Sequence, residues 1–459
     1  MVDFGTARFH ASNLITGALP RDPAACSARL AEQFLNQNVG VLTHLGVSGA
    51  ISYDGYEVDL VFQSSNKVGA VPLLSPTSGR IDYGLVINPR FGWSGVGPMM
   101  AQTGWRIVPR ILKLPLLPKS ARGIPAWVIS TVVLLRMREL LKQLNRRFEI
   151  VEQELPAPRG TVLWSAYALQ QMPRVHFLTV PCRYPDLRDD RELKSAVHFT
   201  LRKQLASLES QPHVGVVQAL QAICHDLLRQ VQAFPALRPP MSAMQQWLSH
   251  SIRREAFREG LQAIEWTIED RGLAGLSDFQ GLPWIMSMEE YFEALAETLI
   301  ERVARHVGGT VKIGRKRETI RPIEWDPPYL GSQRFLLPDV VLSNEDETVV
   351  VDAKYKVHWE ELRTEHWRNT EEQLRENHRE DLLQVLAYST IFSTPKVTAC
   401  LLYPCRMSTW DKMVESDRTF HQASIAAGNR QIRLILTAVP LEAGIDKPVQ
   451  SLVRALRLC

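Results

Sequence analysis

Hydrophobic positions follow three successive patterns along the chain. Residues 1 to about 120 carry short β-branched runs, such as 40–45 and 56–62, which glycines and prolines interrupt. From Pro125 onward, apolar side chains instead recur every three or four positions, as on the buried face of a helix. We therefore predict a strand-rich N-terminal domain over 1–122, which is expected to dock a partner, and a mostly helical middle region over 123–283. The helices that we expect in the middle region span 127–148, 190–208, 214–234 and 242–268.

The last third of the chain, 284–459, alternates helical and strand patterns. A helix is expected at 286–306 and a second helix at about 374–392. Strands are expected at 334–343, 348–355, 397–403 and 432–439. The order helix, strands, helix, strand predicts an α/β sandwich around a small mixed sheet. The fold class expected for the whole chain is therefore multidomain α+β.

Composition narrows the class of protein only slightly. The chain of 459 residues has 45% hydrophobic and 22% charged residues, with a net charge of +4, which is typical of a globular protein. Six cysteines without a CxxC pair favour a reducing cytoplasm over a disulfide scaffold. The chain opens without an apolar leader, and its most apolar run, 124–135, is shorter than the roughly 20 residues of a membrane span. We expect a cytoplasmic protein without a membrane segment, and a buried helix at that run.

Two aspartates are expected to face each other across one hairpin. The run 337–342 is followed by a polar turn at 343–347 and by a second apolar run that ends in Asp352, Ala353 and Lys354. The antiparallel register that aligns the two apolar runs pairs 342 with 349 and Asp339 with Asp352. Facing side chains lie about 5 Å apart, so two such carboxylates repel each other unless a cation lies between them.

Mg²⁺ is the cation that suits this pair, because it is a hard ion that prefers oxygen ligands, and Mn²⁺ is a possible substitute. Bound there, it could also hold a phosphate and a water. Lys354 falls on the same strand face as Asp352, two residues beyond it. Its ammonium group could orient the water or stabilise the charge that develops on a phosphate.

A non-catalytic origin of these residues is the alternative interpretation. A strand that ends in Asp-x-Lys arises often by chance, and acid pairs near hairpin ends are often only solvated. The combination with Gln384 and Tyr388 favours chemistry, because residues four apart share one helix face.

These residues together resemble the PD-(D/E)xK nucleases. Pro338-Asp339, Asp352-x-Lys354 and Gln384-xxx-Tyr388 are similar to the superfamily motif with a RecB-type QxxxY helix. The stretches 337–341, 351–356 and Tyr403-Pro404 resemble the McrC family, the nuclease subunit of McrBC-type restriction systems.

The resemblance implies a third metal ligand on the helix that precedes the sheet. In that family an acidic residue lies in a sequence motif similar to Leu-Phe-Glu, and residues 291–293 match this motif. The resemblance therefore implies that Glu293 is the third ligand, beside Asp339 and Asp352. Glutamates at 289, 293, 297 and 301 repeat every four residues, however, and could simply form a solvated helix face.

The resemblance also implies an activity and partners. The activity is Mg²⁺-dependent cleavage of double-stranded DNA, with Lys354 at the water and with Gln384 and Tyr388 positioning the DNA backbone or Lys354. The partner is an McrB-like GTP-hydrolysing ring that recognises modified DNA, and this chain contains no P-loop motif of its own. The alternative is a non-cleaving adaptor that keeps the fold only to stimulate the NTPase.

Four other features have more than one interpretation. The glycine-rich stretch 84–104, with Arg90, Phe91, Trp93 and Trp105, could stack on bases, dock a partner or form ordinary turns. The charged stretch 357–381 is expected to be a polar surface segment, either a flexible insertion or an extension of the helix. Arginines and lysines at 136, 138, 142, 146 and 147 suit phosphate contact, an acidic partner or simple solvation. Cys400 and Cys405 are expected in or near the core.

Overall fold

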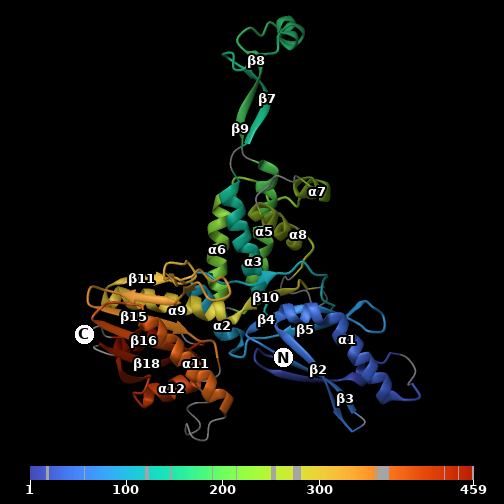
Figure 1. Ribbon diagram of the computed structural model, residues 1–459. Coiled ribbons are helices and arrows are strands. Elements are labelled where there is room, and N and C mark those ends of the chain that lie inside the picture. Colours follow the sequence, from blue (N-terminus) through green and yellow to red (C-terminus); the bar gives the residue numbers. More distant parts are fainter. Residues whose placement is uncertain are drawn as a thin grey trace. The chain divides into compact units, whose positions relative to one another are not determined.

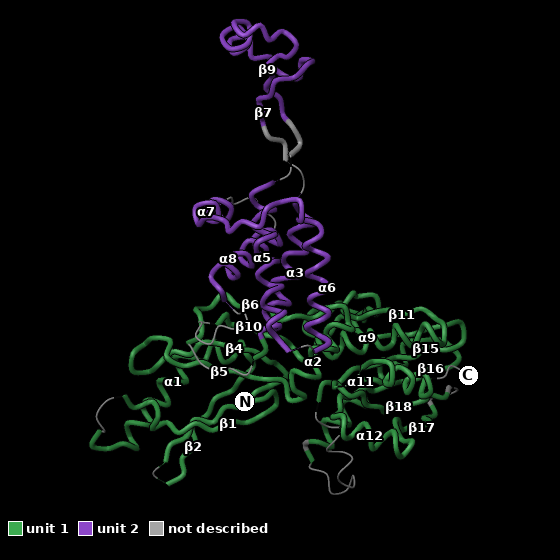
Figure 2. Tube along the Cα trace, turned by 180° about the vertical axis from the view of Figure 1, so that it is seen from behind, with its two compact units in different colours: residues 1–125, 280–459 green, residues 126–279 purple. Residues whose placement is uncertain are grey.

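The computed structural model describes thirteen stretches of the chain (Figure 1). They are residues 1–16, 20–55, 57–118, 124–144, 147–188, 190–212, 214–249, 255–271, 281–356, 359, 372–427, 430–442 and 444–456. The chain divides into two compact units, one made of 1–125 together with 280–459 and one made of 126–279 (Figure 2). The first and last of the three expected domains therefore belong to a single unit. Within the described residues, no helix combines the length and apolarity of a membrane span.

The N-terminal part of the first unit is rich in strands, as the sequence predicts. Its elements are β1 (Thr6–His10), a short 3-10 helix (Ala11–Leu14), α1 (Pro23–Leu45), β2 (Val47–Asp54), β3 (Glu57–Ser64), β4 (Lys67–Leu74), β5 (Ile81–Ile87), α2 (Gly92–Gln102) and β6 (Arg110–Ile111). The strand expected at 40–45 is wrong, because these residues are the end of α1. Asp22 caps the start of α1 through Ala25 N, and Gly46 ends it with φ 73°, in the left-handed region.

A strand near the start of the segment 280–459 explains why this segment and 1–125 form one unit. β10 (Trp284–Ser287) pairs with β4 and with β6, giving a four-stranded sheet in the order β5-β4-β10-β6. Backbone hydrogen bonds therefore join segments that lie about 200 residues apart in the chain.

The C-terminal part of this unit is a mixed sheet covered by helices. Its elements are α9 (Met288–Val307), β11 (Thr310–Ile313), β12 (Arg321–Pro322), β13 (Phe335–Leu336), β14 (Val340–Ser343), β15 (Glu347–Ala353), α11 (Glu372–Ser389), β16 (Lys396–Cys405), α12 (Met407–Glu415), β17 (Phe420–Ala427), β18 (Arg430–Pro440) and α13 (Asp446–Ala455). Six strands follow the order β11-β14-β15-β16-β18-β17, with parallel pairs on both sides of β16. α9 packs on β14 and β15, and α11 packs on β15 and β16.

The hairpin register expected from the sequence is confirmed. Val340 pairs with Val351 and Leu342 with Val349, which is the alignment that sets Asp339 against Asp352. The single strand expected at 334–343 is instead split into β13 and β14 around Pro338, which has no N–H to give to a ladder. Cys400 and Cys405 are fully buried, as expected.

The second unit is helical, with an added strand ladder. Its helices are α3 (Trp127–Gln143), α4 (Trp164–Ala166), a π-helix (Tyr167–Gln171), a 3-10 helix (Met172–Arg174), α5 (Arg191–Glu209), α6 (Gly215–Val231), α7 (Met241–Ser249) and α8 (Glu255–Ile268). Its strands are β7 (Arg147–Leu155), β8 (Thr161–Val162) and β9 (Val180–Arg188), in the order β7-β9-β8. The helix expected at 127–148 ends at Gln143, and the apolar run at its start is buried, as predicted.

The basic residues of α3 do not all face solvent, because at least Arg136 packs against another helix of the same unit. Arg136 pairs with Glu259 at 3.2 Å and lies over the Trp266 ring, 4.6 Å from its centroid. Lys142 pairs with Glu139 at 2.8 Å. Arg146 lies outside the described residues. Arg136 therefore packs α3 against α8 within this unit.

Candidate functional site

The two aspartates predicted to face each other lie at the open end of the β14–β15 hairpin. Asp352 is 1% exposed on β15, and Asp339 is half-buried directly before β14. Asp339 Oδ2 accepts a hydrogen bond from Ala353 N at 2.8 Å, which ties its carboxylate to the partner strand. The hydrophobic strands thus carry two acids to one point at which water is largely excluded.

Electrostatics at this point disfavour two bare negative charges. Burial raises the pKa of Asp339 well above its usual value, and the nearby Asp352 and Glu293 carboxylates raise it further. Burial also raises the pKa of Asp352, although the Lys354 ammonium opposes this shift. A bound cation would relieve the repulsion and the loss of hydration together.

Lys354 is held in place by two partners. Its Nζ lies 2.8 Å from Asp352 Oδ2 and donates to Gln384 Oε1 at 2.8 Å. Gln384 in turn donates through Nε2 to the Tyr388 hydroxyl at 3.0 Å. Burial alone would lower the pKa of Lys354, but Asp352 and Asp339 raise it overall, so the ammonium stays charged. The helix pair Gln384 and Tyr388 therefore reaches the lysine of the hairpin.

A metal ion fits the aspartate pair better than it fits the full three-carboxylate set. Asp352 Oδ2 is buried, and no hydrogen bond with ordinary angles reaches it even though Lys354 Nζ lies close by. An oxygen in that state is suited to ligate a hard cation. Among the described residues, however, no group of three or more His, Cys, Asp or Glu side chains is gathered closely enough to hold a metal. The present geometry thus brings Asp339 and Asp352 together, with Glu293 in electrostatic range of Asp339.

The alternative interpretation of the glutamate repeat on α9 is a solvated helix face. This interpretation is wrong for Glu297, which lies one turn after Glu293. Glu297 is 1% exposed on α9 and forms a bidentate pair with Arg315, 2.6 Å on each side, and a further contact of 3.0 Å with Arg106. Glu301 also pairs with Arg106, at 2.6 Å. Burial, and then Glu289, raise the pKa of Glu293 to about 7. The glutamate repeat on α9 is therefore largely an organised, partly buried ion-pair network.

Sequence reasoning did not single out a second carboxylate–lysine pair beside the first. Lys356 Nζ lies 2.6 Å from Asp381 Oδ1, and the Tyr403 hydroxyl donates to Asp381 Oδ2 at 3.1 Å. Asp381 is 3% exposed and adds to the upward shift of the Asp352 pKa. The sequence contains a pattern that could have revealed this pair. Asp381 lies three residues before Gln384 on one helix face, and Lys356 lies two residues after Lys354 along the chain.

The expectation that 357–381 is a polar surface segment is only partly confirmed where the structure describes it, because Glu372, Arg379 and Glu380 are exposed whereas other side chains are buried. Trp359 is 4% exposed and packs against Tyr403, and His378 is 6% exposed beside the same tyrosine. Residues 372–381 belong to α11, whereas His358, His366 and Trp367 lie outside the described residues.

Arg90 and its aromatic neighbours form a packed cage. This arrangement differs from the three interpretations of the glycine-rich stretch, which are stacking on bases, docking of a partner and ordinary turns. The guanidinium carbon lies 4.4 Å from the Tyr355 ring centroid, 4.9 Å from Phe4 and 5.0 Å from Phe91. Asp3 Oδ2 lies 3.6 Å from Arg90 Nε and accepts from the Tyr355 hydroxyl at 2.9 Å. This cage fixes Tyr355, the residue that follows Lys354. Residues 84–87 of the glycine-rich stretch belong to β5 and residues 92–102 form α2, with Trp105 buried after it.

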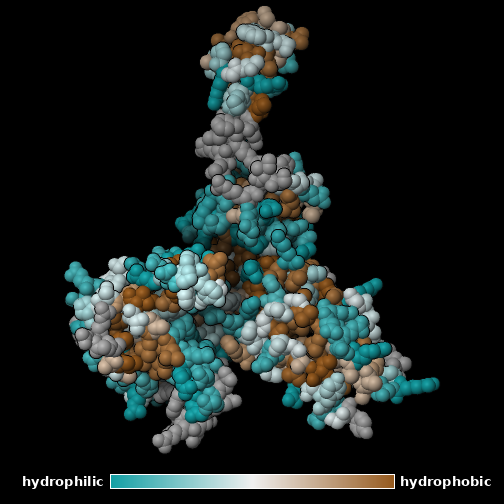
Figure 3. Space-filling view, in the orientation of Figure 1, coloured by the Kyte–Doolittle hydropathy of each residue, from teal (hydrophilic) through white to brown (hydrophobic). Residues whose placement is uncertain are grey.

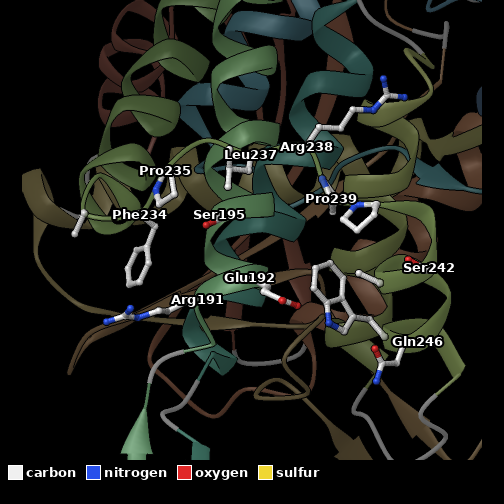
Figure 4. Close-up of a pocket in the computed structure, with 14 residues that line it drawn as sticks. Arg191, Glu192, Ser195, Phe234, Pro235, Leu237, Arg238, Pro239, Ser242 and Gln246 are labelled. Carbon is white, nitrogen blue, oxygen red and sulfur yellow. The ribbon is translucent and has the colours of Figure 1, made fainter.

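The helical unit contains a separate hollow of about 1250 Å³ (Figure 4). Arg191 and Glu192 at the start of α5 line it together with Trp247 of α7 and the proline-rich stretch 235–240. None of the residues predicted as a site lies in it.

Fold and site together define a multidomain mixed α/β protein with a pair of acids, one buried and one half-buried, and a fixed lysine at one hairpin. The chain belongs to the McrBC 5-methylcytosine restriction system component family, whose model matches residues 112–404. No curated protein matches it.

Two solved structures from Thermococcus gammatolerans are similar to this chain. One is a refined half-complex from a tetradecameric assembly of McrB AAA+ hexamers with bound McrC, at 14% identity and a TM-score of 0.43, covering 100% of this chain and 99% of that one. The other is a cryo-EM structure of the McrBC complex, at 12% identity and a TM-score of 0.28, covering 66% and 87%.

Proposed function

We propose that this chain is the Mg²⁺-dependent DNA endonuclease subunit of an McrBC-like restriction complex, with a PD-(D/E)xK nuclease core at 284–459. The observation that carries the proposal is the contact of Lys354 Nζ with both Asp352 and Gln384, beside a second, half-buried carboxylate at Asp339. Membership of the McrBC family supports a role in restriction.

Each residue has a role that its contacts suggest. Asp339 and Asp352 would hold the ion, with Glu293 as the third carboxylate. When bound, the ion would polarise a phosphate oxygen and lower the pKa of a water. Lys354 faces the charge that develops on the phosphate, and Gln384 keeps the ammonium at that position, with Tyr388 as its support.

The proposed substrate is double-stranded DNA, and the proposed partner is an McrB-like P-loop GTPase ring in the cytoplasm. An exposed apolar patch in the helical unit supports partner docking at a second place, beside the docking role expected for the N-terminal domain, which stays a prediction. The patch lies between β8 and β9, at the top of Figure 3, and its members share high exposure: Trp164, Leu169, Met172, Val175, Phe177 and Leu178.

The direct test is plasmid cleavage by this chain with its neighbouring NTPase, nucleotide and Mg²⁺. We expect Asp352→Asn and Lys354→Met each to lower the cleavage rate at least about 100-fold, because each removes several kcal/mol of stabilisation from the transition state. Asp417→Asn is the matched control, since that side chain is 94% exposed.

Cleavage by Asp352→Asn at the parent rate would overturn the assignment. If the parent chain stimulates the NTPase but never cleaves, the adaptor alternative is correct.

A further inference from the structure

A small hairpin leads directly into the candidate site. β12 and β13 pair Arg321 with Leu336 and Pro322 with Phe335, and Ile323 N donates to Arg334 O at 2.8 Å. We call residues 321–336 the 321–336 hairpin. It ends three residues before Asp339, so its position is coupled to the acid pair through a very short stretch of chain.

Two hydrogen bonds fix the chain before the hairpin to the residues beside the acid pair. Thr319 Oγ1 donates to Pro338 O at 2.6 Å, and Gly314 N donates to Asp339 O at 2.7 Å. Thr319 is 4% exposed, so the first bond is shielded from water. A ligand that reaches Asp339 therefore comes close to the base of the hairpin.

The hairpin exposes an unusual amount of apolar surface for its size. Trp325 is 42% exposed, Tyr329 56%, Leu330 77% and Phe335 42%. The Trp325 and Tyr329 rings contact each other edge to face, with 6.0 Å between their centroids. Trp325 Nε1 donates to Gln333 O at 2.9 Å. These contacts hold two large rings in position while their surfaces face solvent, which is typical of a contact surface for another molecule.

Exposed cationic side chains at the base of the hairpin, rather than around its rings, suit contact with nucleic acid. Arg321 and Arg334 are exposed at the base of the hairpin, and Lys316 and Arg317 are exposed on the chain that leads to it. The carboxylates of Glu324 and Asp326 flank Trp325, so we assign the phosphate contacts to the base of the hairpin and the base contacts to its rings.

We propose that the 321–336 hairpin contacts duplex DNA next to the scissile phosphate, with Trp325 and Tyr329 inserted as wedges between base steps while Arg321 and Arg334 bind phosphates. The inference rests on the proposed nuclease function, and it names the surface that holds the substrate. Such a wedge partly unstacks the base step that it enters, and it depends little on sequence because every base has a flat face. Recognition of a modified base would then remain a task of the partner.

Fluorescence anisotropy with a labelled duplex tests the proposal in the full chain that carries Asp352→Asn, which keeps the DNA intact. Adding Trp325→Ala and Tyr329→Ala should weaken binding at least about 10-fold, because the stacking contribution of about 1–3 kcal/mol per ring is partly offset by the few kcal/mol that unstacking a base step costs. Trp325→Phe with Tyr329→Phe should restore most of the affinity. Tyr53→Ala is the matched control, because Tyr53 is 66% exposed on β2 of the same unit.

Salt dependence separates the two kinds of contact. Arg334→Ala should lower the slope of log affinity against log salt by about 1, whereas the aromatic variants should leave that slope unchanged.

Equal duplex affinity in the double alanine variant and its parent overturns the hairpin proposal, and loss of NTPase co-elution in that variant then identifies a protein surface instead. The nuclease proposal survives that result if plasmid cleavage persists. Failure of the parent to bind duplex overturns the hairpin proposal, whereas the nuclease proposal is overturned only if plasmid cleavage with the NTPase partner is absent as well.

Discussion

At the scale of single residues, the site depends on how tightly Lys354 is oriented. Its ammonium group has one acidic and one amide partner, and the amide belongs to a helix rather than to the hairpin. The QxxxY pair is therefore a connection between α11 and β15, and its contribution can be measured separately from that of the acids.

Removing that connection should slow cleavage without removing DNA binding. We expect Gln384→Ala to lower the turnover rate about 10- to 100-fold, because a hydrogen bond to a charged group contributes about 1.5–3 kcal/mol. Tyr388→Phe removes only the acceptor behind Gln384, so a smaller loss of about 5- to 10-fold is expected. Steady-state cleavage kinetics measure both, with the exposed Gln422→Ala on β17 as control. Equal losses in all three variants would contradict this role.

Glu293 predicts a pH dependence of stability in the metal-free protein. Burial and Glu289 raise its pKa from 4.5 to about 7. The folded protein therefore holds this proton more tightly than the unfolded chain, so the stabilisation is complete below about pH 4.5 and is lost as pH rises through about 7. Glu293→Gln should stabilise the protein at pH 8 by about 1–2 kcal/mol, a value discounted for partial solvation, and should change little at pH 4.5.

Urea unfolding in the presence of EDTA measures this difference. Equal effects of Glu293→Gln at both pH values would show that the glutamate is not desolvated as the α9 network requires. Glu290→Gln, at an exposed position of the same helix, is the control.

At the scale of elements, the sequence predicted local patterns well and missed what depends on distant contacts. The β14–β15 register followed from two apolar runs and one polar turn, and α9 and α11 followed from their periodicity. The ladder β7-β9-β8 was missed because its exposed residues, such as Ile150, give no alternation that marks a buried face. The strand expected at 40–45 failed because the cap at Asp22 and the stop at Gly46 outweighed local β propensity.

The patch between β8 and β9 makes a prediction at this scale. Phe177→Asp with Leu178→Asp should abolish co-elution of the chain with its NTPase partner, because charged side chains cannot be buried in an apolar contact without a large desolvation cost. The melting temperature should stay the same, since these side chains are 58% and 89% exposed. Val39→Asp, 59% exposed on α1, is the control. Intact co-elution of the double variant would exclude the patch as the docking surface.

At the scale of the whole molecule, the N-terminal segments are part of the unit that contains the candidate site. β10 sits between β4 and β6, and the Arg90 cage joins Asp3 and Phe4 to Tyr355. No local pattern predicts such pairing, because the partners are separated by most of the chain. For the same reason Asp339, Asp352 and Lys354 could be proposed from one hairpin, whereas the proposed third ligand on α9 needed information from another element.

The central claim is that Asp339 and Asp352 together form a divalent-metal centre. Calorimetric titration of the full chain with Mn²⁺ tests it most directly, because it needs neither DNA nor the partner. We predict measurable binding that weakens at least about 10-fold in Asp339→Asn and in Asp352→Asn, since each variant removes one charged ligand, and that is unchanged in Asp417→Asn. Mn²⁺ binding of equal strength in the parent and both site variants would contradict the account.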